Sequence, residues 1–235
     1  MAATLEISSS SIVAVGNFNP PIFTPDWLER NKLIGEDDAE GARKDAQLVI
    51  SPQLTRFETA LFALQVFEQQ FSLTSKGPLH PMLKDLAIGI FTLLPQTPIT
   101  AIGLNYQAHY KLSDDTDYHN IGDILAPKEI WRSLFPGENE SVGLMSLTMG
   151  VEPYKRDEKG KKTGDRKSFT VQPSGKIPRG VFFAVNDHHQ IDDERRGENV
   201  TSAEYAIKIA DALWQKTWDE SMHVFESIIK QCLAK

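Results

Sequence analysis

The sequence predicts an α+β fold in which two ferredoxin-like-related β-α-β-β-α halves form one antiparallel-rich sheet covered by two long helices. Three observations favour this fold. Segments with strand-like alternation of apolar residues are interspersed with segments of helical periodicity. Residues 1–112 read in the order β-α-β-β-α-β, which is typical of the ferredoxin-like arrangement. Residues 113–235 read as a helix, three strands and a second long helix, so we expect the two halves to share one compact unit.

The first half is predicted from its turn residues and its periodicity. We expect, in order, a strand over residues 7–17, a helix over 24–33, a polar turn over 35–45, strands over 47–56 and 60–74, a helix over 81–94 and a strand over 99–112. Asn19, Pro20 and Pro21 end the first strand because proline cannot donate a hydrogen bond to a neighbouring strand. Thr24 begins the first helix, since its hydroxyl can cap the helix and Pro25 fits the first helical position. The apolar face of the strand over 60–74 is expected to hold Leu61, Ala63, Phe67, Phe71 and Leu73.

The second half ends in a long amphipathic helix. We expect, in order, an acidic loop over residues 113–120, a short helix over 127–135, strands over 141–151, 167–171 and 181–191, a charged loop over 192–199 and the helix over 201–233. The apolar face of this helix holds Ala203, Ala206, Ile207, Ile209, Ala210, Leu213, Trp214, Trp218, Val224, Phe225, Ile228, Ile229 and Cys232. Its polar face holds Lys208, Gln215, Lys216, Asp219, His223, Glu226 and Lys230. Such a helix is not stable alone, so we expect it to pack on the same sheet face as the helix over 81–94.

Composition limits the class of protein. The chain has 235 residues, of which 40% are hydrophobic and 24% charged, as in an ordinary globular protein. No apolar run approaches the roughly 18 residues that a membrane span needs, and the first residues lack the features of a signal peptide. The single Cys232 excludes an internal disulfide framework, and we expect a cytoplasmic protein. A net charge of -7 disfavours general binding to nucleic acid or to anionic membranes.

Sequence motifs of catalysis are absent. The chain contains no GxxxxGK[ST], no GxGxxG and no GxSxG, and Cys232 falls on the apolar face of the last helix, where a thiol is normally inert. Enzymes usually show at least one arrangement of nucleophile, base or ligand with a fixed spacing. We therefore expect a non-enzymatic protein that requires no cofactor and holds no metal ion.

The alternative interpretation is a metal-dependent hydrolase or nuclease, and one candidate site lies at the end of the last strand. Asp187 and His189 are the candidate catalytic residues there, since the alternation of side chains turns His188 to the opposite face. The plainer interpretation of this cluster is a polar strand end that runs into a solvated loop.

A second cluster lies in the acidic loop. Asp114, Asp117 and His119 could bind Mg²⁺ or act as acid and base if this loop closes over a cleft. The plainer interpretation is a capped turn, because aspartates in such loops usually bond to their own backbone. If the two clusters formed one site, they would lie within about 10 Å of each other in a pocket.

A locally basic segment supports a third possibility, a nucleic-acid-binding module. Its candidate binding residues are Lys155, Arg156, Lys159, Lys161, Lys162, Arg166 and Lys167. Such a segment can contact a phosphate backbone or an acidic partner. It contains no aromatic residue beyond Tyr154 to stack on bases, so a solvated hairpin tip is the plainer interpretation.

One middle segment resembles a known family. Residues 102–106 (IGLNY), which follow a proline-bounded helix, resemble the central signature of a sporadically distributed bacterial protein family of unknown function. The strand that ends near Asn186 and Asp187 and the long helix with Phe225 late in it are similar too. The resemblance implies a bacterial cytoplasmic protein and carries over no catalytic residue.

The most informative segment for function is the strand predicted over residues 141–151. One of its faces holds Gly143, Met145, Leu147, Met149 and Val151, and the other holds Leu144, Ser146, Thr148 and Gly150. The small residues let another backbone approach closely, and the flexible thioethers of Met145 and Met149 suit an adaptable contact. The same methionines could also fill the core of a monomer. We expect an interaction protein that works as a homodimer or with a protein partner, either as a homo-oligomer or as an accessory subunit of a bacterial multi-gene system.

Overall fold

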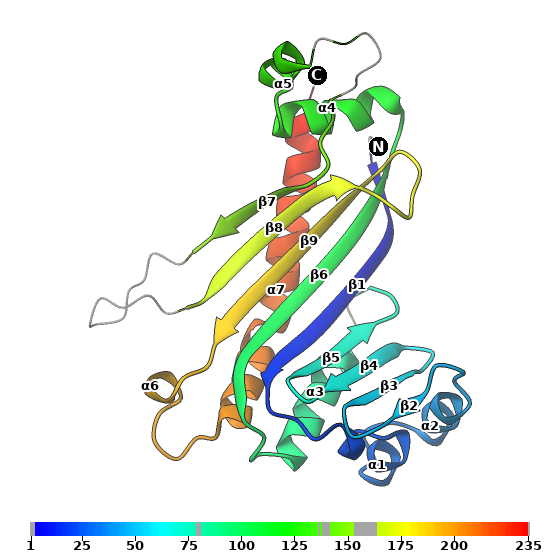
Figure 1. The fold of residues 1–235 in the computed structure, drawn as a ribbon, viewed down its shortest axis with the longest axis vertical. Helices are drawn as coiled ribbons and strands as arrows, with labels where there is room; N and C mark the ends of the chain where they lie inside the picture. The colour runs from blue at the N-terminus through cyan, green and yellow to red at the C-terminus, as the bar shows by residue number, and fades with distance from the viewer. Residues whose placement is uncertain (1–2, 79–80, 136, 138–141, 153–163, 235) are drawn as a thin grey trace.

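The core of the protein is one nine-stranded antiparallel sheet, as seen in a computed structural model that describes residues 3–78, 81–135, 137, 142–152 and 164–234 (Figure 1). The strands lie in the order β2-β3-β4-β5-β1-β6-β9-β8-β7, and every neighbouring pair is antiparallel. The strands are β1 (Ala3–Gly16), β2 (Val49–Ile50), β3 (Leu54–Glu58), β4 (Phe62–Phe67), β5 (Gln70–Ser75), β6 (Ile99–Leu112), β7 (Leu147–Val151), β8 (Arg166–Pro173) and β9 (Gly180–Gln190). The helices are η1 (Pro20–Ile22), α1 (Pro25–Arg30), α2 (Glu36–Arg43), α3 (Pro81–Leu93), α4 (Asp115–Leu125), α5 (Glu129–Leu134), α6 (Asp193–Arg196) and α7 (Ser202–Leu233).

The two halves of the chain share a connectivity around the central pair β1 and β6. Each of these 14-residue strands leads into helices, then into a meander whose last strand returns to pair with it, and then into another helix. In this way β5 returns to β1 and β9 returns to β6. The ferredoxin-like arrangement is not confirmed, because its β-α-β units would place parallel strands side by side and all neighbouring strands here are antiparallel.

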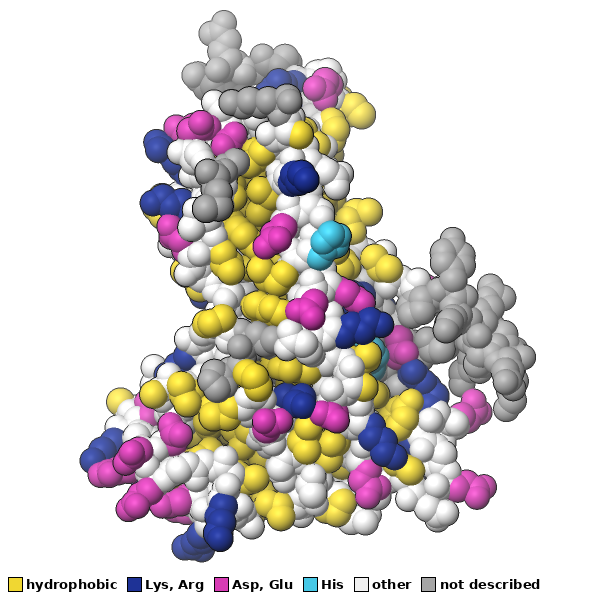
Figure 2. Space-filling model, turned by 180° about the vertical axis from the view of Figure 1, so that it is seen from behind, with side chains coloured by type: hydrophobic (Ala, Val, Ile, Leu, Met, Phe, Trp, Pro, Cys, Tyr) yellow, Lys and Arg dark blue, Asp and Glu magenta, His cyan; other side chains and the backbone are white. Residues whose placement is uncertain are grey.

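The long helices lie on one face of the sheet. As predicted, α3 and α7 pack on the same face and contact each other, and Lys84 on α3 pairs with Asp211 on α7 at 2.6 Å (Figure 1). Viewed from this side, hydrophobic side chains run along the molecule between charged ones (Figure 2). The opposite face is more polar and includes Asn105, whose amide donates to the Ser11 hydroxyl, although His109 and Phe182 also pack together on it. An antiparallel sheet with one packed face and one polar face is a common arrangement.

Helix α7 crosses both hydrophobic clusters of the protein. Its capping box is complete, since the Thr201 hydroxyl accepts from the Glu204 amide and the Glu204 carboxylate accepts from the Thr201 amide. Near its start Trp214 packs in the cluster formed with α3 and β1, and near its end Phe225 packs in the cluster formed with β8 and β9. The predicted apolar and polar faces of this helix are confirmed by the burial of its residues.

Two acidic segments predicted as a turn and a loop are helical. Residues 35–45, predicted as a polar turn, contain α2, and residues 113–120, predicted as a loop, contain the first part of α4. Both helices place acidic residues in the first turn, where the free N–H groups and the helix dipole favour negative charge. The acidic runs are therefore helix starts.

The segment predicted as one strand over residues 60–74 is a hairpin. The chain turns at Glu68 and Gln69, between β4 and β5. Buried positions fall on even-numbered residues before the turn and on odd-numbered residues after it. The predicted apolar face was thus wrong before the turn, where Leu61 and Phe67 are exposed, and right at Phe71 and Leu73.

Three other predicted boundaries shift. The strand predicted over 47–56 is split into β2 and β3. Of the strand predicted over 141–151, residue 141 lies outside the described residues, and only β7 forms a strand within 142–151. The charged loop predicted over 192–199 contains the short helix α6. By contrast, the strand predicted over 99–112 coincides with β6.

The packing of α7 leads to a prediction about stability. Phe225 is 1% exposed and stacks on Phe183 with ring centroids 5.0 Å apart, whereas Lys230 is exposed. We expect Phe225→Ala to lower the free energy of unfolding by about 3 to 5 kcal/mol, because it removes a buried ring and leaves a cavity. Lys230→Ala should lower it by less than about 0.5 kcal/mol. Chemical denaturation of both variants checks this ranking, and the reverse order would contradict the assigned helix face.

Candidate functional site

Asp187 and His189 lie together on the helix-covered face of β9, beneath α7. Asp187 is 6% exposed. Nε2 of His189 lies 3.2 Å from Oδ1 of Asp187, so the two side chains form an ion pair when the imidazole is protonated. The alternation along β9 turns His188 to the other face, as the sequence predicted.

Three elements converge on the Asp187 carboxylate. The Thr217 hydroxyl on α7 donates to Oδ2 at 2.6 Å, and Nζ of Lys167 on β8 lies 3.1 Å from the same oxygen. Lys167 also pairs with Glu220 on α7 at 2.8 Å. We call Lys167, Asp187, His189, Thr217 and Glu220 the waist cluster, because it lies between the two hydrophobic clusters that α7 crosses.

Electrostatics in the waist cluster favours the charged forms. Burial alone would raise the pKa of the Asp187 carboxyl, but its contacts with His189, Thr217 and Lys167 outweigh burial and lower the pKa to about 2. Burial likewise opposes the charge on Lys167, and its contacts with Glu220 and Asp187 raise the pKa of its amine. The waist cluster therefore holds α7 on the sheet through paired charges, of which that of Asp187 is buried.

A second ion pair continues the waist cluster toward α6. Arg195 donates to both carboxylate oxygens of Asp165 at 2.7 and 2.6 Å. Asp165 also accepts from the backbone N–H of Gln190 at 3.0 Å, and its Oδ1 lies 4.0 Å from Nδ1 of His189. Such bidentate pairing fixes geometry as well as charge, so it ties α6 to the residue before β8, and the bond from Gln190 ties that residue to the end of β9.

The second predicted cluster does not form a site of converging side chains. Asp114 caps α4, and its carboxylate accepts from the backbone N–H of Asp117 at 2.8 Å. Asp117 is buried in the first turn of α4, and the exposed His119 packs its ring against Tyr118. The aspartate cap agrees with the plainer interpretation of this segment.

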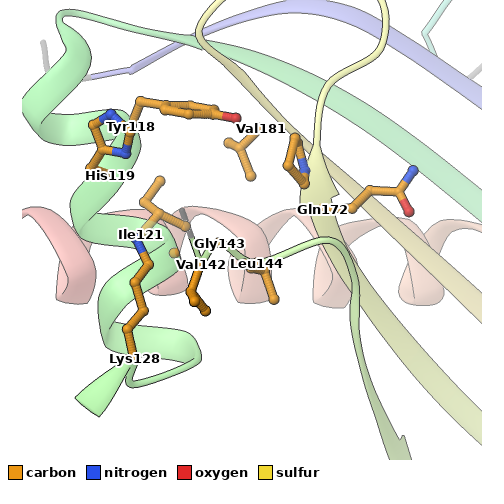
Figure 3. A pocket seen from close by; sticks show the side chains of 11 residues that line it. Tyr118, His119, Ile121, Lys128, Val142, Gly143, Leu144, Gln172 and Val181 are labelled. Atoms are coloured by element: carbon orange, nitrogen blue, oxygen red, sulfur yellow. The ribbon is translucent and has the colours of Figure 1, made fainter. Parts of the chain in front are cut away.

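One cavity of about 210 Å³ lies between α4, the segment before β7 and strands β8 and β9 (Figure 3). Its walls are mainly apolar, with Ile121, Leu144 and Val181 among them. His119 and Lys128 supply nitrogen atoms, and the Lys128 amine pairs with Asp123. Neither Asp114 nor Asp117 lines this cavity, so it brings in only His119 of the predicted catalytic residues.

The two predicted clusters lie far apart. Asp187 is opposite Leu104 on β6, whereas Asp114 follows Leu112 at the end of the same strand. Eight strand residues at about 3.4 Å each separate the two clusters by about 27 Å. In the described part of the chain, no three His, Cys, Asp or Glu side chains are placed to hold a metal ion. The geometry thus gives no shared site for the hydrolase or nuclease alternative.

The basic segment lies mostly outside the described residues. This is the case for Lys155, Arg156, Lys159, Lys161 and Lys162. Of the two described members, Arg166 is exposed at the start of β8, and Lys167 points to the helix side, where it is paired in the waist cluster. Lys167 therefore serves an internal contact.

Sequence reasoning missed the α7 contribution to the waist cluster. Thr217 and Ser221 are buried polar residues one turn apart in the middle of the apolar face, and the Ser221 hydroxyl donates to the Thr217 carbonyl. Two polar residues at this spacing in an apolar stripe were the available signal. They indicate that the sheet opposite must present a polar group, because a buried hydroxyl needs a partner.

The sequence matches no model of a known protein family and no curated protein. Among the described helices, none combines the length and the apolar character that a membrane crossing requires.

The waist cluster leads to a prediction about pH. The pKa of Asp187 is lowered in the folded state, from 3.8 to about 2, so its carboxylate stabilises the fold above pH 3.8 and this stabilisation is lost as the pH falls toward 2. We expect this group to contribute a loss of about 1 kcal/mol in the free energy of unfolding between about pH 6 and about pH 3. In Asp187→Asn this component should disappear.

Urea denaturation at both pH values measures the effect. Asp219→Asn is the matched control, since Asp219 is an exposed carboxylate on the same helix. Equal pH dependence in the wild type and in Asp187→Asn would show that the waist cluster does not hold a charged carboxylate.

Proposed function

We propose that this chain is a non-enzymatic interaction protein that acts by binding another protein, as a homo-oligomer or as an accessory subunit of a bacterial multi-gene system. The observation that carries the proposal is the exposed apolar surface of α5. Ile130 is 74% exposed, Trp131 53%, Leu134 64% and Phe135, directly after the helix, 51%. None of the residues of α5 is buried.

The exposed apolar area of these four residues is larger than that of a single exposed apolar residue, which is common on protein surfaces. The large side chains of the six-residue α5 are exposed to solvent, although a helix of this length gains its stability from packing against the rest of the protein. The apolar character continues after α5, where Met145 is 84% exposed and Met149 on β7 is 59% exposed. A cluster of large exposed apolar side chains such as the one on α5 is typical of an interface. Trp and Met are also typical of binding surfaces.

A protein partner fits this surface better than a lipid bilayer. Helices that lie in a membrane surface carry a polar face rich in lysine and arginine. The α5 helix has six residues, and the whole chain has a net charge of -7, which opposes anionic lipids. We propose no second function, because Asp187 and His189 make their contacts with residues inside the fold and the cavity beside α4 is small.

The test compares capture of a partner by two variants. Leu134→Glu places a charge in the α5 surface, whereas Leu61→Glu places one at an exposed leucine in the turn before β4, 42% exposed. We expect a tagged wild-type chain and Leu61→Glu to retain the same partner from host cells in stoichiometric amounts, and Leu134→Glu to lose it at least tenfold, about 1.4 kcal/mol in binding free energy. Quantitative mass spectrometry measures the retained partner, and circular dichroism confirms the fold of each variant.

Two outcomes would contradict the proposal. One is the retention of the same partner by Leu134→Glu. The other is the absence of any partner or self-association together with sedimentation of the wild type on lipid vesicles, which would identify α5 as a membrane-surface element.

A further inference from the structure

We propose that β7 is a self-association edge, at which the β7 strand of a second copy of this chain pairs antiparallel and joins two nine-stranded sheets into one. The inference rests on the proposed function and deepens it, because it names a second copy as a partner of the exposed apolar surface. It is carried by the two edges of the sheet, which differ in their protection against further pairing.

Edge strands present unpaired N–H and C=O groups, so proteins that stay monomeric usually shorten them or protect them with charge or proline. The edge strand β2 follows this rule, since it has only two residues. The edge strand β7 has five residues, none of them charged and none of them proline, and Glu152 and Pro153 follow it. Of these two edge strands, β2 is protected by its short length, whereas β7 offers five residues to a further strand.

The two faces of β7 have opposite characters. Met149 lies opposite Phe169, which lies opposite Val185 and then Tyr106, a residue that contacts α7. The α7 side of β7 therefore carries Leu147, Met149 and Val151. On the other face Thr148 bonds to Thr170 at 2.9 Å. An added strand must match an apolar face to an apolar face.

A second copy meets this requirement in one arrangement. If a twofold axis stands perpendicular to the sheet at Met149, all five residues of β7 pair, with Leu147 opposite Val151 of the other copy and Met149 opposite Met149. Both copies then place α7 on the same side, and the apolar side chains of the two strands form one continuous strip. A twofold axis in the plane of the sheet would instead set apolar residues against Thr148 and Gly150.

Charge opposes self-association of this chain, so the contact must be stabilised by apolar packing and strand pairing. Each copy carries a net charge of -7, so two copies repel each other at long range, and this repulsion is screened by salt. Added salt should therefore leave the affinity of the dimer unchanged or raise it, whereas added salt would lower the affinity for a basic partner. Five residue pairs make a small interface beside the roughly 800 Å² per partner of a stable complex. We therefore expect a dimer near about 100 µM and a monomer below about 1 µM.

Sedimentation of the purified chain over this concentration range tests the inference without any host partner. Met149→Lys should abolish the dimer and leave the fold intact, since Met149 is 59% exposed. Ile50→Lys on β2 is the matched control, because Ile50 is 48% exposed on the other edge strand and should leave the dimer unchanged. A wild type that remains monomeric at about 100 µM would overturn the proposal, and so would a dimer that survives Met149→Lys.

Disulfide trapping tests the register. In Met149→Cys the two copies place their thiols directly opposite each other, close enough for a disulfide. An added oxidant such as diamide takes two electrons and two protons from the pair, and we expect a covalent dimer on a non-reducing gel. Ile50→Cys should stay uncoupled, and the native Cys232 is buried. If Met149→Cys stays monomeric while Leu134→Glu still loses a host partner, the second copy is wrong and the interaction function stands.

Discussion

The packing of Tyr106 against α7 is the contact on which the rest of this structure depends. Tyr106 is fully buried at the centre of β6, its ring lies 5.3 Å from the rings of both Trp214 and Trp218, and its hydroxyl donates to the Trp214 carbonyl at 2.5 Å. Burial raises the pKa of this hydroxyl, so it stays a donor. Because β6 pairs with both β1 and β9, a helix anchored on β6 covers both halves of the sheet.

The waist cluster fixes the position of α7 along the sheet. Apolar packing alone would tolerate a shift of α7 by one helical turn, since aromatic and aliphatic residues recur along its length. The buried pairing of Asp187 with Thr217 and Lys167 does not tolerate such a shift, because it would leave a charge buried without partners. We therefore infer that the waist cluster selects one position of α7 over positions shifted by a helical turn. The same contacts place Asp187 and His189, two residues that look catalytic in the sequence, in the packing between α7 and the sheet.

The predictions made from strong apolar periodicity were reliable, whereas those made from runs of charged residues were misleading. The faces of α7 and the limits of β6 followed from apolar spacing, which the core enforces over many residues. The acidic starts of α2 and α4 were read as loops, although Asp114 offers a cap and acids favour a first turn. The hairpin at Glu68 was predicted as one strand because both of its strands carry apolar residues. Only the change of the buried positions from even-numbered to odd-numbered residues marks the turn. The meeting of Thr217 with Asp187 depends on tertiary packing, which spacing along the chain does not encode.

The central pairing of β1 with β6 has a consequence for the order of folding. Residues 11–15 of β1 can pair early with β5, but the ladder from Ala3 to Ser10 has only β6 as its partner. Ile12 lies opposite Leu104, so this ladder closes a long loop and must wait until β6 has been synthesised. Such non-local pairings are slow, and a strand that waits with both edges free is open to aggregation. The first half of β1 is thus secured only after β6 has been made, and a nascent chain would benefit from a chaperone until β6 has left the ribosome.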